Sequence, residues 1–461
     1  MRSKQTVGQE VGAVEPMSVV DTAWLRMDTL DNLMVINGVV EFETPMSRES
    51  LVRLLSERLV VKAPRFGKRA MSKNGHYWWE PVPNMDWDYH AATITLPEGG
   101  DPEQLLQQAC SNVVAEMLDP TRPLWRFYLI ESYRGASALV FKVHHSYADG
   151  IALISTLDAI ADTSVLHSSP AARVKRKSFE AKTSALHHKL QVLLQKGLFY
   201  SAFSAAWLFE MFRVAFLPSD SKAAFKQSLS SQKQVAWARS LKIEDVKQVG
   251  RAMGGTMNDV VLACAAGSLR RYLASQGRPV DGIVVRATVP VNLRPLEEAM
   301  NLGNCFGLVY LPLPVAQADA GARIRAVQKS MKSLKSGAQA VMSYGVLNIL
   351  GHFPTALQRF ALNFFSHKAS AVMTNVPGPS EAVTLMGSKI KRSMFWVPQS
   401  GGIGIGLSIL SYAGSVEFGV VADTAVVENP RVLVEGFVEE FEALKKAVNA
   451  SSVGHAQPHA I

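Results

Sequence analysis

Two apolar segments joined by a short turn, with a helical pattern directly behind them, limit the fold of this chain more than any other feature. The segments "LWRFYLIE" and "SALVFKVHH" lie within residues 124–145, and "SYRGA" separates them. Runs of this length around a Gly-containing turn are typical of a β-hairpin. The next stretch, "DGIALISTLDAIAD", has its apolar residues at helical spacing. We therefore predict that His144 and His145 lie at the rim of a sheet, where side chains face a cleft.

Strand and helix patterns alternate along the rest of the chain. Ser18 to Asp21 form a capping box before "TAWLRM", and Thr256 and Gly277 are the predicted start and stop of "TMNDVVLACAAGSLRRYLASQG". Other strands are predicted over "LMVINGVVEF", "GIVVRATVPVNL", "FGLVYLPLP", "ASAVMTNV", "GIGLSILSYAG" and "VEFGVVAD". Other helices are predicted over "RESLVRLLSERLV", "ADAGARIRAVQKSMKSLK" and "NPRVLVEGFVEEFEALKKAV". Because 461 residues exceed one ordinary core, we predict two domains of the α/β (α+β) class.

The composition changes at Ser164, where "SVLHSSPAARVKRKSFEAKTSALHHKL" begins. This segment is Ser-rich and strongly basic, which indicates a linker, and its His187–His188 pair is interpreted as the solvated start of a basic helix. The predicted organisation is a disordered N-terminus (1–15), an N-terminal domain (16–163), a basic linker with an apolar connecting helix (164–235), a C-terminal domain (236–450) and a disordered tail (451–461).

The longest uncharged apolar run, Gly197 to Phe209, has thirteen residues. A membrane span needs about 18–20. The run is therefore predicted to pack as a connecting helix or to lie on a lipid surface, because basic and aromatic residues accompany it. These residues are Lys189, Lys196, Arg213, Phe199, Phe203 and Trp207.

Charge and cysteine content narrow the class of protein further. The net charge of +9 suits an anionic lipid surface or a phosphate-bearing substrate, and no nucleic-acid-reading motif organises the basic residues. Three isolated cysteines without a disulfide pattern indicate a reducing compartment, and the N-terminus lacks the apolar core of a signal peptide. We expect a cytoplasmic protein that attaches peripherally to a membrane or lipid droplet and binds no nucleic acid.

The chemistry of the histidine pair is best explained by a general base. Consecutive strand residues point to opposite faces, so His144 and His145 cannot both face one cleft as an adjacent metal-ligating pair. Imidazole is a suitable base near neutral pH. The chain has no GxSxG elbow, no HExxH and no phosphate-binding Lys loop. A lone base without a nucleophile of its own needs an activated substrate such as a thioester. Asp149 could orient a ring or pair with an arginine, and Gly150 would allow a close backbone approach.

These residues carry a resemblance to a known family. "HHSYADG" matches the HHxxxDG signature of CoA-dependent acyltransferases. Further along the chain, "PLW" (Pro123, Leu124, Trp125), "TMNDVVLA", "VPVNLR" and "NVPGP" follow the same pattern, as does the opening "MSVVDTAWLRMD". From about Pro16 to Val448 the chain resembles the bacterial-type wax ester synthase/acyl-CoA:diacylglycerol acyltransferase family.

The resemblance implies two pseudo-symmetric domains like chloramphenicol acetyltransferase, with a tunnel at their interface. It implies that His145 is the general base, that His144 and Asp149 support it, and that Asp149 pairs with an arginine, for which Arg294 is the candidate. The implied substrates are acyl-CoA and a long-chain alcohol or a diacylglycerol. Transfer would be direct, without an acyl-enzyme, a metal or another cofactor.

Several of the motif residues also have purely structural explanations. Asp259 completes a capping box with Thr256, whereas Asn258 in the same helical turn could reach the substrate or the oxyanion. "NVPGP" is simplest as a rigid turn, and the PLW motif as packing. In the tunnel interpretation, the residues that line it are Pro123, Leu124, Trp125, Asn375, Pro377 and Gly378.

Two alternative functions follow from the same residues. The first is another HHxxxDG acyltransferase of the condensation type, which would take its acyl group from a carrier protein. The second is a catalytically silent protein that binds lipid or coats droplets, although an intact His145 argues against it. Cys264 lies in a predicted helix and Cys305 in an apolar stretch, so neither is expected to act as a nucleophile.

Overall fold

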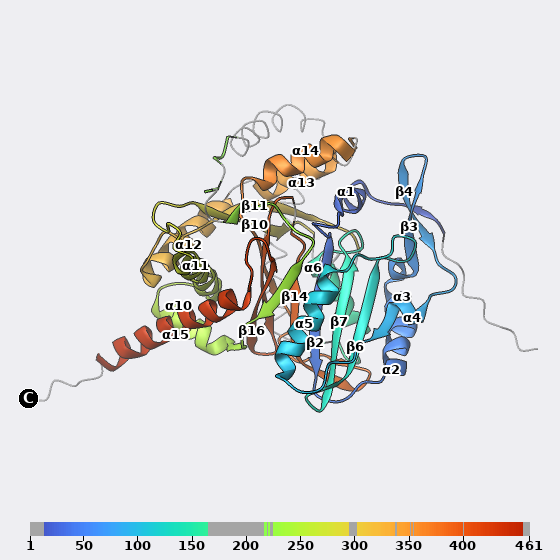
Figure 1. Ribbon diagram of the computed structural model, residues 1–461, viewed down its shortest axis with the longest axis horizontal. Coiled ribbons are helices and arrows are strands. Elements are labelled where there is room, and N and C mark those ends of the chain that lie inside the picture. The colour runs from blue at the N-terminus through green and yellow to red at the C-terminus, as the bar shows by residue number, and fades with distance from the viewer. Residues whose placement is uncertain are drawn as a thin grey trace, which may run out of the picture.

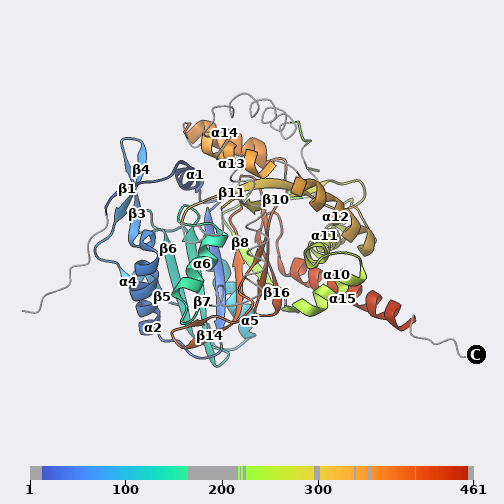
Figure 2. The same ribbon diagram turned by 180° about the vertical axis from the view of Figure 1, so that it is seen from behind.

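The computed structural model describes residues 13–164, 216–218, 220–221, 225–294, 302–336, 339–350, 352–353, 355–399 and 401–454. The RVKRK run at Arg173–Lys177, the His187–His188 pair and the apolar run from Gly197 lie outside the described residues. Two sheets stand side by side with helices around them, as Figures 1 and 2 show from opposite sides. The predicted mixed α/β class is confirmed.

The N-terminal sheet has the strand order β13-β14-β2-β7-β6-β5. Its strands from the first half of the chain are β2 (Val35–Phe42), β5 (Ala91–Thr93), β6 (Trp125–Tyr133) and β7 (Ala136–His144). The predicted hairpin is β6–β7, with positive φ at Arg134 (52°) and Gly135 (78°) in its turn. Two consecutive residues with positive φ match the right-handed twist of the flanking strands, which favours this register.

The other strands of this sheet come from the C-terminal half of the chain. They are β13 (Thr384–Leu385) and β14 (Ser388–Trp396), and β14 runs antiparallel to β2. The sequence patterns predicted neither strand. The sheets therefore do not divide at one point of the chain: β14 covers an edge of β2 that would otherwise be open. In Figure 2 this strand lies among elements of the first half.

The helices of the N-terminal half surround this sheet. They are α1 (Val19–Met27), α2 (Arg48–Arg53), the π-helical η1 (Leu54–Leu59), α3 (Val60–Lys62), the 3₁₀ turn η2 (Pro64–Gly67), α4 (Trp87–His90), α5 (Pro102–Ala115) and α6 (Gly150–Ile160). The single helix predicted over 48–60 is thus α2, η1 and α3 in succession. A small separate sheet has the order β1-β4-β3, with β1 at Glu15–Pro16, β3 at Lys68–Lys73 and β4 at His76–Pro81.

The C-terminal sheet has the order β11-β10-β12-β15-β16-β8, with β9 also paired to β16. Its strands are β8 (Lys233–Trp237), β9 (Leu241–Lys242), β10 (Val285–Asn292), β11 (Phe306–Leu313), β12 (Ala371–Pro377), β15 (Ile405–Tyr412) and β16 (Ser415–Asp423). Its helices are α10 (Ile243–Ala252), α11 (Met257–Ser275), α12 (Ala320–Ser336), α13 (Gln339–Leu350), α14 (Thr355–Ser366) and α15 (Arg431–Gly454). The sequence patterns predicted the strands β10, β11, β12, β15 and β16 and the helices α11, α12 and α15. They missed β8, β9, α10, α13 and α14.

Apolar side chains from both halves meet between the two sheets. One buried cluster joins Val39 and Val140 of the first half to Trp237, Met394 and Trp396 of the second. The halves are thus held together by a continuous core, which fixes the residues at their junction. Among the described residues, no helix is both long and apolar enough to cross a membrane.

Candidate active site

The two adjacent histidines lie at the end of β7, shortly before the chain enters α6. His144 is the last strand residue, and the His145 N–H donates to the Met34 carbonyl at 2.8 Å. Both rings are buried. They have different neighbours, as the alternation of side chains along a strand predicts.

The His145 ring is held by Asn304, which comes from the C-terminal half of the chain. His145 Nδ1 lies 2.7 Å from Asn304 Oδ1. The Asn304 Nδ2 donates to the Asp21 carboxylate at 2.8 Å and to the His145 carbonyl at 2.7 Å. Because those two groups are acceptors, the amide oxygen must face the ring. Nδ1 therefore carries the proton, and Nε2 keeps the lone pair that a base needs.

Trp24 covers one face of the His145 ring, and Phe306 lies tilted beside both rings. The Trp24 ring stacks on that of His145 at 4.3 Å between centroids and 15° between planes, and the Phe306 centroid lies 5.5 Å from that of His145. Burial lowers the pKa of His145 below its usual range, while the negative charge of Asp149 opposes this shift. The ring is consequently neutral at pH 7, and the stacked indole favours the cation that forms when Nε2 takes up a proton.

His144 is arranged as a neutral, structural ring. Its Nδ1 accepts a hydrogen bond from the Ser146 N–H at 3.1 Å, so the proton resides on Nε2. That Nε2 faces Asp28 Oδ2 at 3.7 Å. Burial lowers the pKa of His144 to about 3 and raises the pKa of Asp28 to about 6. The His144 ring is therefore neutral at pH 7, whereas Asp28 is still mostly ionised at that pH.

Both carboxylate oxygens of Asp149 have partners. Its Oδ1 accepts from Ala152 N at 3.0 Å and caps α6. Its Oδ2 lies 3.0 Å from Arg294 Nη2 and accepts from Cys305 N at 3.2 Å. Arg294 and Cys305 both come from the C-terminal half, so the structure brings together the aspartate and the arginine that the sequence paired.

The expectation of a close backbone approach at Gly150 was wrong. A Cβ added there would have one neighbour within 4 Å, the Val376 Cγ2 at 4.0 Å, and no backbone atom. Gly150 instead lines an apolar cavity together with Val143 of β7 and Val376 of β12. The absence of a side chain at Gly150 therefore leaves this cavity wider at its boundary with the second half.

The two asparagine motifs of the C-terminal half meet each other rather than the histidines. Asn258 Oδ1 accepts from Asn375 Nδ2 at 2.6 Å. Asp259 completes the predicted capping box, since its Oδ2 accepts from Thr256 N and from Thr256 Oγ1, each at 2.8 Å. Asp259 therefore stabilises the first turn of α11, and its carboxylate is occupied by these bonds.

None of the six residues predicted to line a tunnel lines the apolar cavity. In the PLW motif, Leu124 N donates to Tyr147 Oη at 3.1 Å and Trp125 Nε1 donates to the Phe66 carbonyl at 2.8 Å, so the motif packs against the loop after the histidines. Gly378 N donates to the Ser411 carbonyl at 2.9 Å in the turn after β12. The cavity is reached instead by neighbouring residues of NVPGP, Val376 and Pro379.

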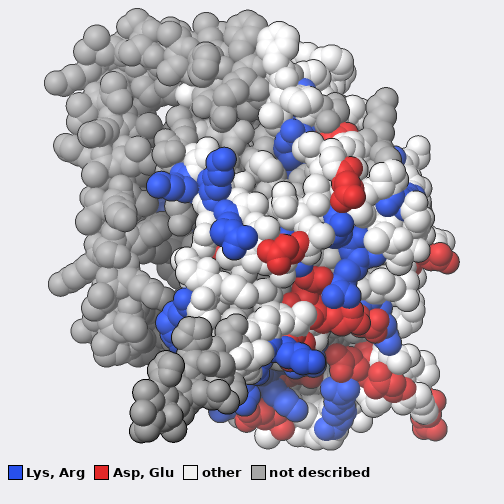
Figure 3. Space-filling model, turned by 90° about the vertical axis from the view of Figure 1, so that its left-hand side faces the viewer, with Lys and Arg blue, Asp and Glu red and all other residues white. Residues whose placement is uncertain are grey.

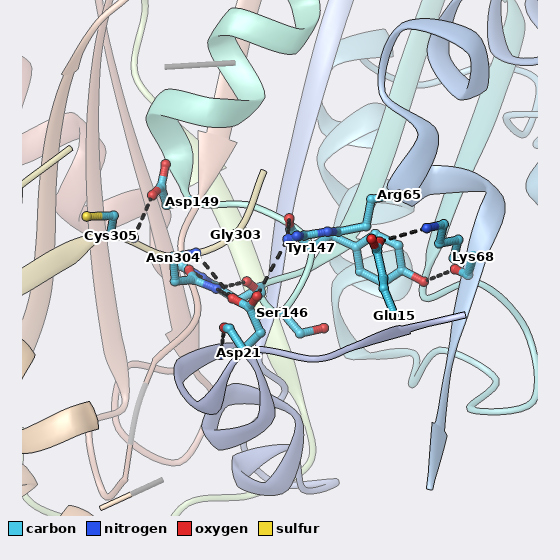
Figure 4. A network of polar contacts seen from close by, with 12 residues as sticks. Glu15, Asp21, Arg65, Lys68, Ser146, Tyr147, Asp149, Gly303, Asn304 and Cys305 are labelled. Atoms are coloured by element: carbon cyan, nitrogen blue, oxygen red, sulfur yellow. Dashed lines mark hydrogen bonds and ion pairs between the residues drawn. The ribbon is translucent and has the colours of Figure 1, made fainter. Parts of the chain in front are cut away.

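Sequence reasoning missed Asp21, Asn304, Trp24 and Phe306. Asp21 was interpreted as half of a capping box, and its N–H does donate to Ser18 Oγ at 3.0 Å. Its carboxylate, however, turns to Asn304 and lies 3.5 Å from Arg65 Nη1. Figure 4 shows Asp21 of α1, Ser146 of the loop after β7 and Asn304 of the stretch before β11 close to one another. No local pattern could have revealed contacts between segments so far apart in the chain.

Comparisons with known proteins place this geometry in a family. The model of the wax ester synthase/diacylglycerol acyltransferase catalytic domain matches residues 17–261, and that of the WS/DGAT C-terminal domain matches residues 302–445. A probable diacylglycerol O-acyltransferase of Mycobacterium tuberculosis is 27% identical over 91% of this chain and 93% of that protein. Wax ester synthase/diacylglycerol acyltransferase 1 of Arabidopsis thaliana is 26% identical over 97% of this chain and 98% of its own length.

Solved structures show the same fold. The wax ester synthase/diacylglycerol acyltransferase of Marinobacter aquaeolei aligns with a TM-score of 0.65 at 20% identity, covering 94% of this chain and 100% of that one. The first condensation domain of the calcium-dependent antibiotic synthetase aligns with a TM-score of 0.61 at 15% identity, covering 94% of this chain and 97% of that one. The predicted two-domain architecture is confirmed by these likenesses.

Proposed function

Because the chain belongs to the wax ester synthase/diacylglycerol acyltransferase family, we propose that it moves a fatty acyl group from acyl-CoA to the hydroxyl of a long-chain alcohol or a diacylglycerol. One observation carries the proposal. His145 has its Nδ1 occupied by Asn304 and its Nε2 left as a base, at the junction of the two halves and near an apolar cavity.

In the proposed reaction, His145 Nε2 takes the proton of the acceptor hydroxyl as its oxygen attacks the thioester carbonyl. The tetrahedral intermediate then breaks its C–S bond. The imidazolium returns the proton to the departing CoA sulfur, so the base is regenerated and an ester and free CoA are formed. No side-chain nucleophile or cofactor is needed, because the thioester is already activated. Asn258 remains our candidate donor to the oxyanion, through its Nδ2 group.

The apolar cavity supports a fatty substrate. Residues of the N-terminal sheet such as Ile36 and Phe141 line one side, Leu157 of α6 another, and Val376 and Leu410 the part contributed by the C-terminal half. Each methylene that leaves water for such a hydrocarbon-walled cavity contributes about 0.8 kcal/mol, which favours binding of an alkyl chain. We propose that it holds the acyl chain, with the thioester near His145.

We also propose that the protein works at a lipid surface and that α14 contacts it. This helix exposes apolar side chains and buries a polar one. Phe360 is 70% exposed, whereas Gln358 is 2% exposed and donates to the Ala23 carbonyl on α1 at 3.0 Å. Leu357 and Phe364 are exposed on the same side as Phe360, at helical spacing. By contrast, basic and acidic side chains are interspersed over the face in Figure 3. Since α1 carries Trp24, the apolar side of α14 lies one helix away from the base.

Vesicle binding tests this role of α14. In flotation with phosphatidylcholine/phosphatidylglycerol vesicles, Phe360→Ser should weaken binding about tenfold, because an aromatic ring no longer leaves water. Val432→Ser on α15 is the matched control, since Val432 is also exposed (42%). Equal binding by both variants would remove α14 from the proposal.

The activity itself is tested by CoA release from palmitoyl-CoA. Hexadecanol and a diacylglycerol are offered separately to the wild type, to His145→Ala and to a control, His76→Ala, at an exposed residue of β4. We expect acceptor-dependent release that His145→Ala abolishes and His76→Ala does not, and the two acceptors are ranked directly. Release that survives in His145→Ala would overturn the mechanism. No release with either acceptor would favour a carrier-dependent condensation-type enzyme or a silent lipid binder.

A further inference from the structure

We propose that Asn304 and Asp21 are positioning residues that make His145 a base, so that the base is completed only when the two halves of the chain have assembled. This inference rests on the proposed acyl transfer through His145. It assigns a role to a relay from Asp21 through the Asn304 amide to the His145 ring. Neither residue touches the reacting atoms in this role, because both act through Nδ1, on the opposite side of the ring from Nε2.

The first argument is the number of bonds that hold the Asn304 side chain. Its Nδ2 has two acceptors, Asp21 Oδ1 and the His145 carbonyl, and its own backbone N–H also donates to Asp21 Oδ1 at 3.2 Å. With both amide hydrogens used, the amide cannot rotate to present its NH₂ to the ring. The only hydrogen bond left to Oδ1 is with Nδ1–H, which excludes the other neutral tautomer.

The second argument is the construction of the surroundings of Asp21. Asp21 is 1% exposed, and its second oxygen faces Arg65. Burial raises the pKa of Asp21, and Arg65 opposes that shift. A buried carboxylate with this set of donors is costly unless all of them are in place. The arrangement is more than a helix cap requires, because the Asp21 carboxylate is also bonded by Asn304 and faced by Arg65, which lie outside α1.

The third argument is the backbone that delivers Asn304. Gly303 has a φ of 110°, which favours glycine, and a Cβ there would lie 3.0 Å from Arg65 Nη1 and 3.2 Å from Asp21 Oδ2. Gly303 pairs as a parallel bridge with Ala148, and its N–H donates to the Tyr147 carbonyl at 2.9 Å. The stretch 302–305 is thus docked directly onto the loop that follows the histidines, as Figure 4 shows.

An amide partner has a different consequence from a carboxylate partner. A neutral amide oxygen fixes the tautomer without strongly stabilising the imidazolium, so the ring stays a free base. The charged groups around His145 are Asp149 with its partner Arg294 and, behind the amide, Asp21 with Arg65; His144 and Asp28 lie on the other side. Moving the carboxylate from position 21 to position 304, next to the His145 ring, should therefore change the pH at which activity is lost.

The first experiment reads the tautomer directly. Ring ¹⁵N shifts of His145 in full-length, ¹⁵N-histidine-labelled protein should report Nδ1–H in the wild type and a mixture of tautomers in Asn304→Leu. The matched control is Asn37→Leu, which removes another buried amide, 5% exposed, on β2. An Nε2–H ring in wild-type protein that still shows acceptor-dependent CoA release would overturn the inference while the acyl transfer itself stands. Conversely, wild-type protein that shows Nδ1–H but releases no CoA would overturn the function alone.

The second experiment reads catalysis. Asn304→Leu should lower kcat on the order of 10²–10⁴-fold, as loss of tautomer control does in a serine protease, with KM for palmitoyl-CoA unchanged. The exchange Asp21→Asn with Asn304→Asp keeps an acceptor for Nδ1–H but makes it charged. Because a carboxylate favours the imidazolium, the acid limb of kcat/KM should move up by about 1 pH unit or more and kcat should recover relative to Asn304→Leu. The proposal would be overturned if the acid limb of kcat/KM stayed at its wild-type pH in the exchange variant. It would also be overturned if Asn304→Leu and Asn37→Leu had equal kcat at equal Tm.

Discussion

Two helices of this protein begin with the same pattern and use it differently. At the start of α11, Thr256 and Asp259 form a closed capping box, in which the Asp259 carboxylate bonds to Thr256 N and Oγ1 at 2.8 Å each. At the start of α1, Ser18 caps the helix, but the carboxylate of Asp21 bonds to Asn304 at 2.8 Å and faces Arg65. The local pattern thus determines where each helix begins, while a distant segment decides what the aspartate does.

The largest expected difference between Asp21 of α1 and Asp259 of α11 is in the effect of their removal on kcat. Asp21→Ala should lower kcat for CoA release about 100-fold or more, because Asn304 loses the acceptor that holds its amide toward His145. Single-turnover CoA release, normalised to the folded fraction, measures this. If Asp259→Ala gave the same loss with the same pH profile, the two aspartates would have equivalent roles and the comparison would fail.

Two glycines, Gly303 beside Asp21 and Gly277 after α11, allow the same comparison between the site and α11. Gly303→Ala should cost about 1–3 kcal/mol in strain and contacts and also reduce kcat, because its Cβ would push Arg65 and Asp21 apart. Gly277, which ends α11 with a φ of 63°, has nothing within 4 Å of an added Cβ. Gly277→Ala should therefore cost about 1–2 kcal/mol of stability while kcat per folded molecule is retained. Denaturant unfolding and steady-state kinetics on both variants separate the outcomes, and an unaltered kcat in Gly303→Ala would contradict the expectation.

A smaller effect is expected from removing the closed capping box. Asp259→Ala should reduce the free energy of unfolding by about 0.5–2 kcal/mol, the usual cost of a lost N-terminal cap. It should leave the acid limb of kcat/KM at its wild-type pH, because Asp259 bonds within its own helical turn. Urea denaturation gives the first quantity and a pH series gives the second; a displaced limb would connect Asp259 to the base.

The smallest expected effect is in the wild-type pH profile. Burial disfavours the cation of His145, so its pKa lies below the usual value of about 6.5. A base acts in its neutral form, and the acid limb of kcat/KM should therefore lie below pH 6.5. The profile is measured from pH 4.5 to 8 with saturating acceptor. A limb above pH 6.5 would mean that the charge of Asp149 outweighs burial.

Most of the elements near the site could be predicted because they are encoded locally. The β6–β7 hairpin, the start of α6 at Asp149 and the whole of α11 follow from alternation, turn residues and caps within a few residues of each other. The strand β14 and the helices α13 and α14 could not be predicted in this way. β14 is held by pairing with β2 from the other half, and α14 exposes its apolar side while Gln358 is buried. Such elements contradict the usual patterns because tertiary contacts, or a surface outside the chain, complete them.

The sequence by itself determined the family, the mixed α/β class and the location of the histidine pair, since HHxxxDG lies at a strand–helix junction that local propensity creates. Only the tertiary structure decided which nitrogen of His145 carries the proton and which is left as the candidate base. That choice depends on the Asn304 Oδ1 that accepts from Nδ1–H and on Asp21, which orients the Asn304 amide; Asp21 and Asn304 are separated by 283 positions in the chain. Hydrogen bonds act over about 3 Å regardless of sequence separation, so a partner of this kind becomes visible only once the halves have folded together.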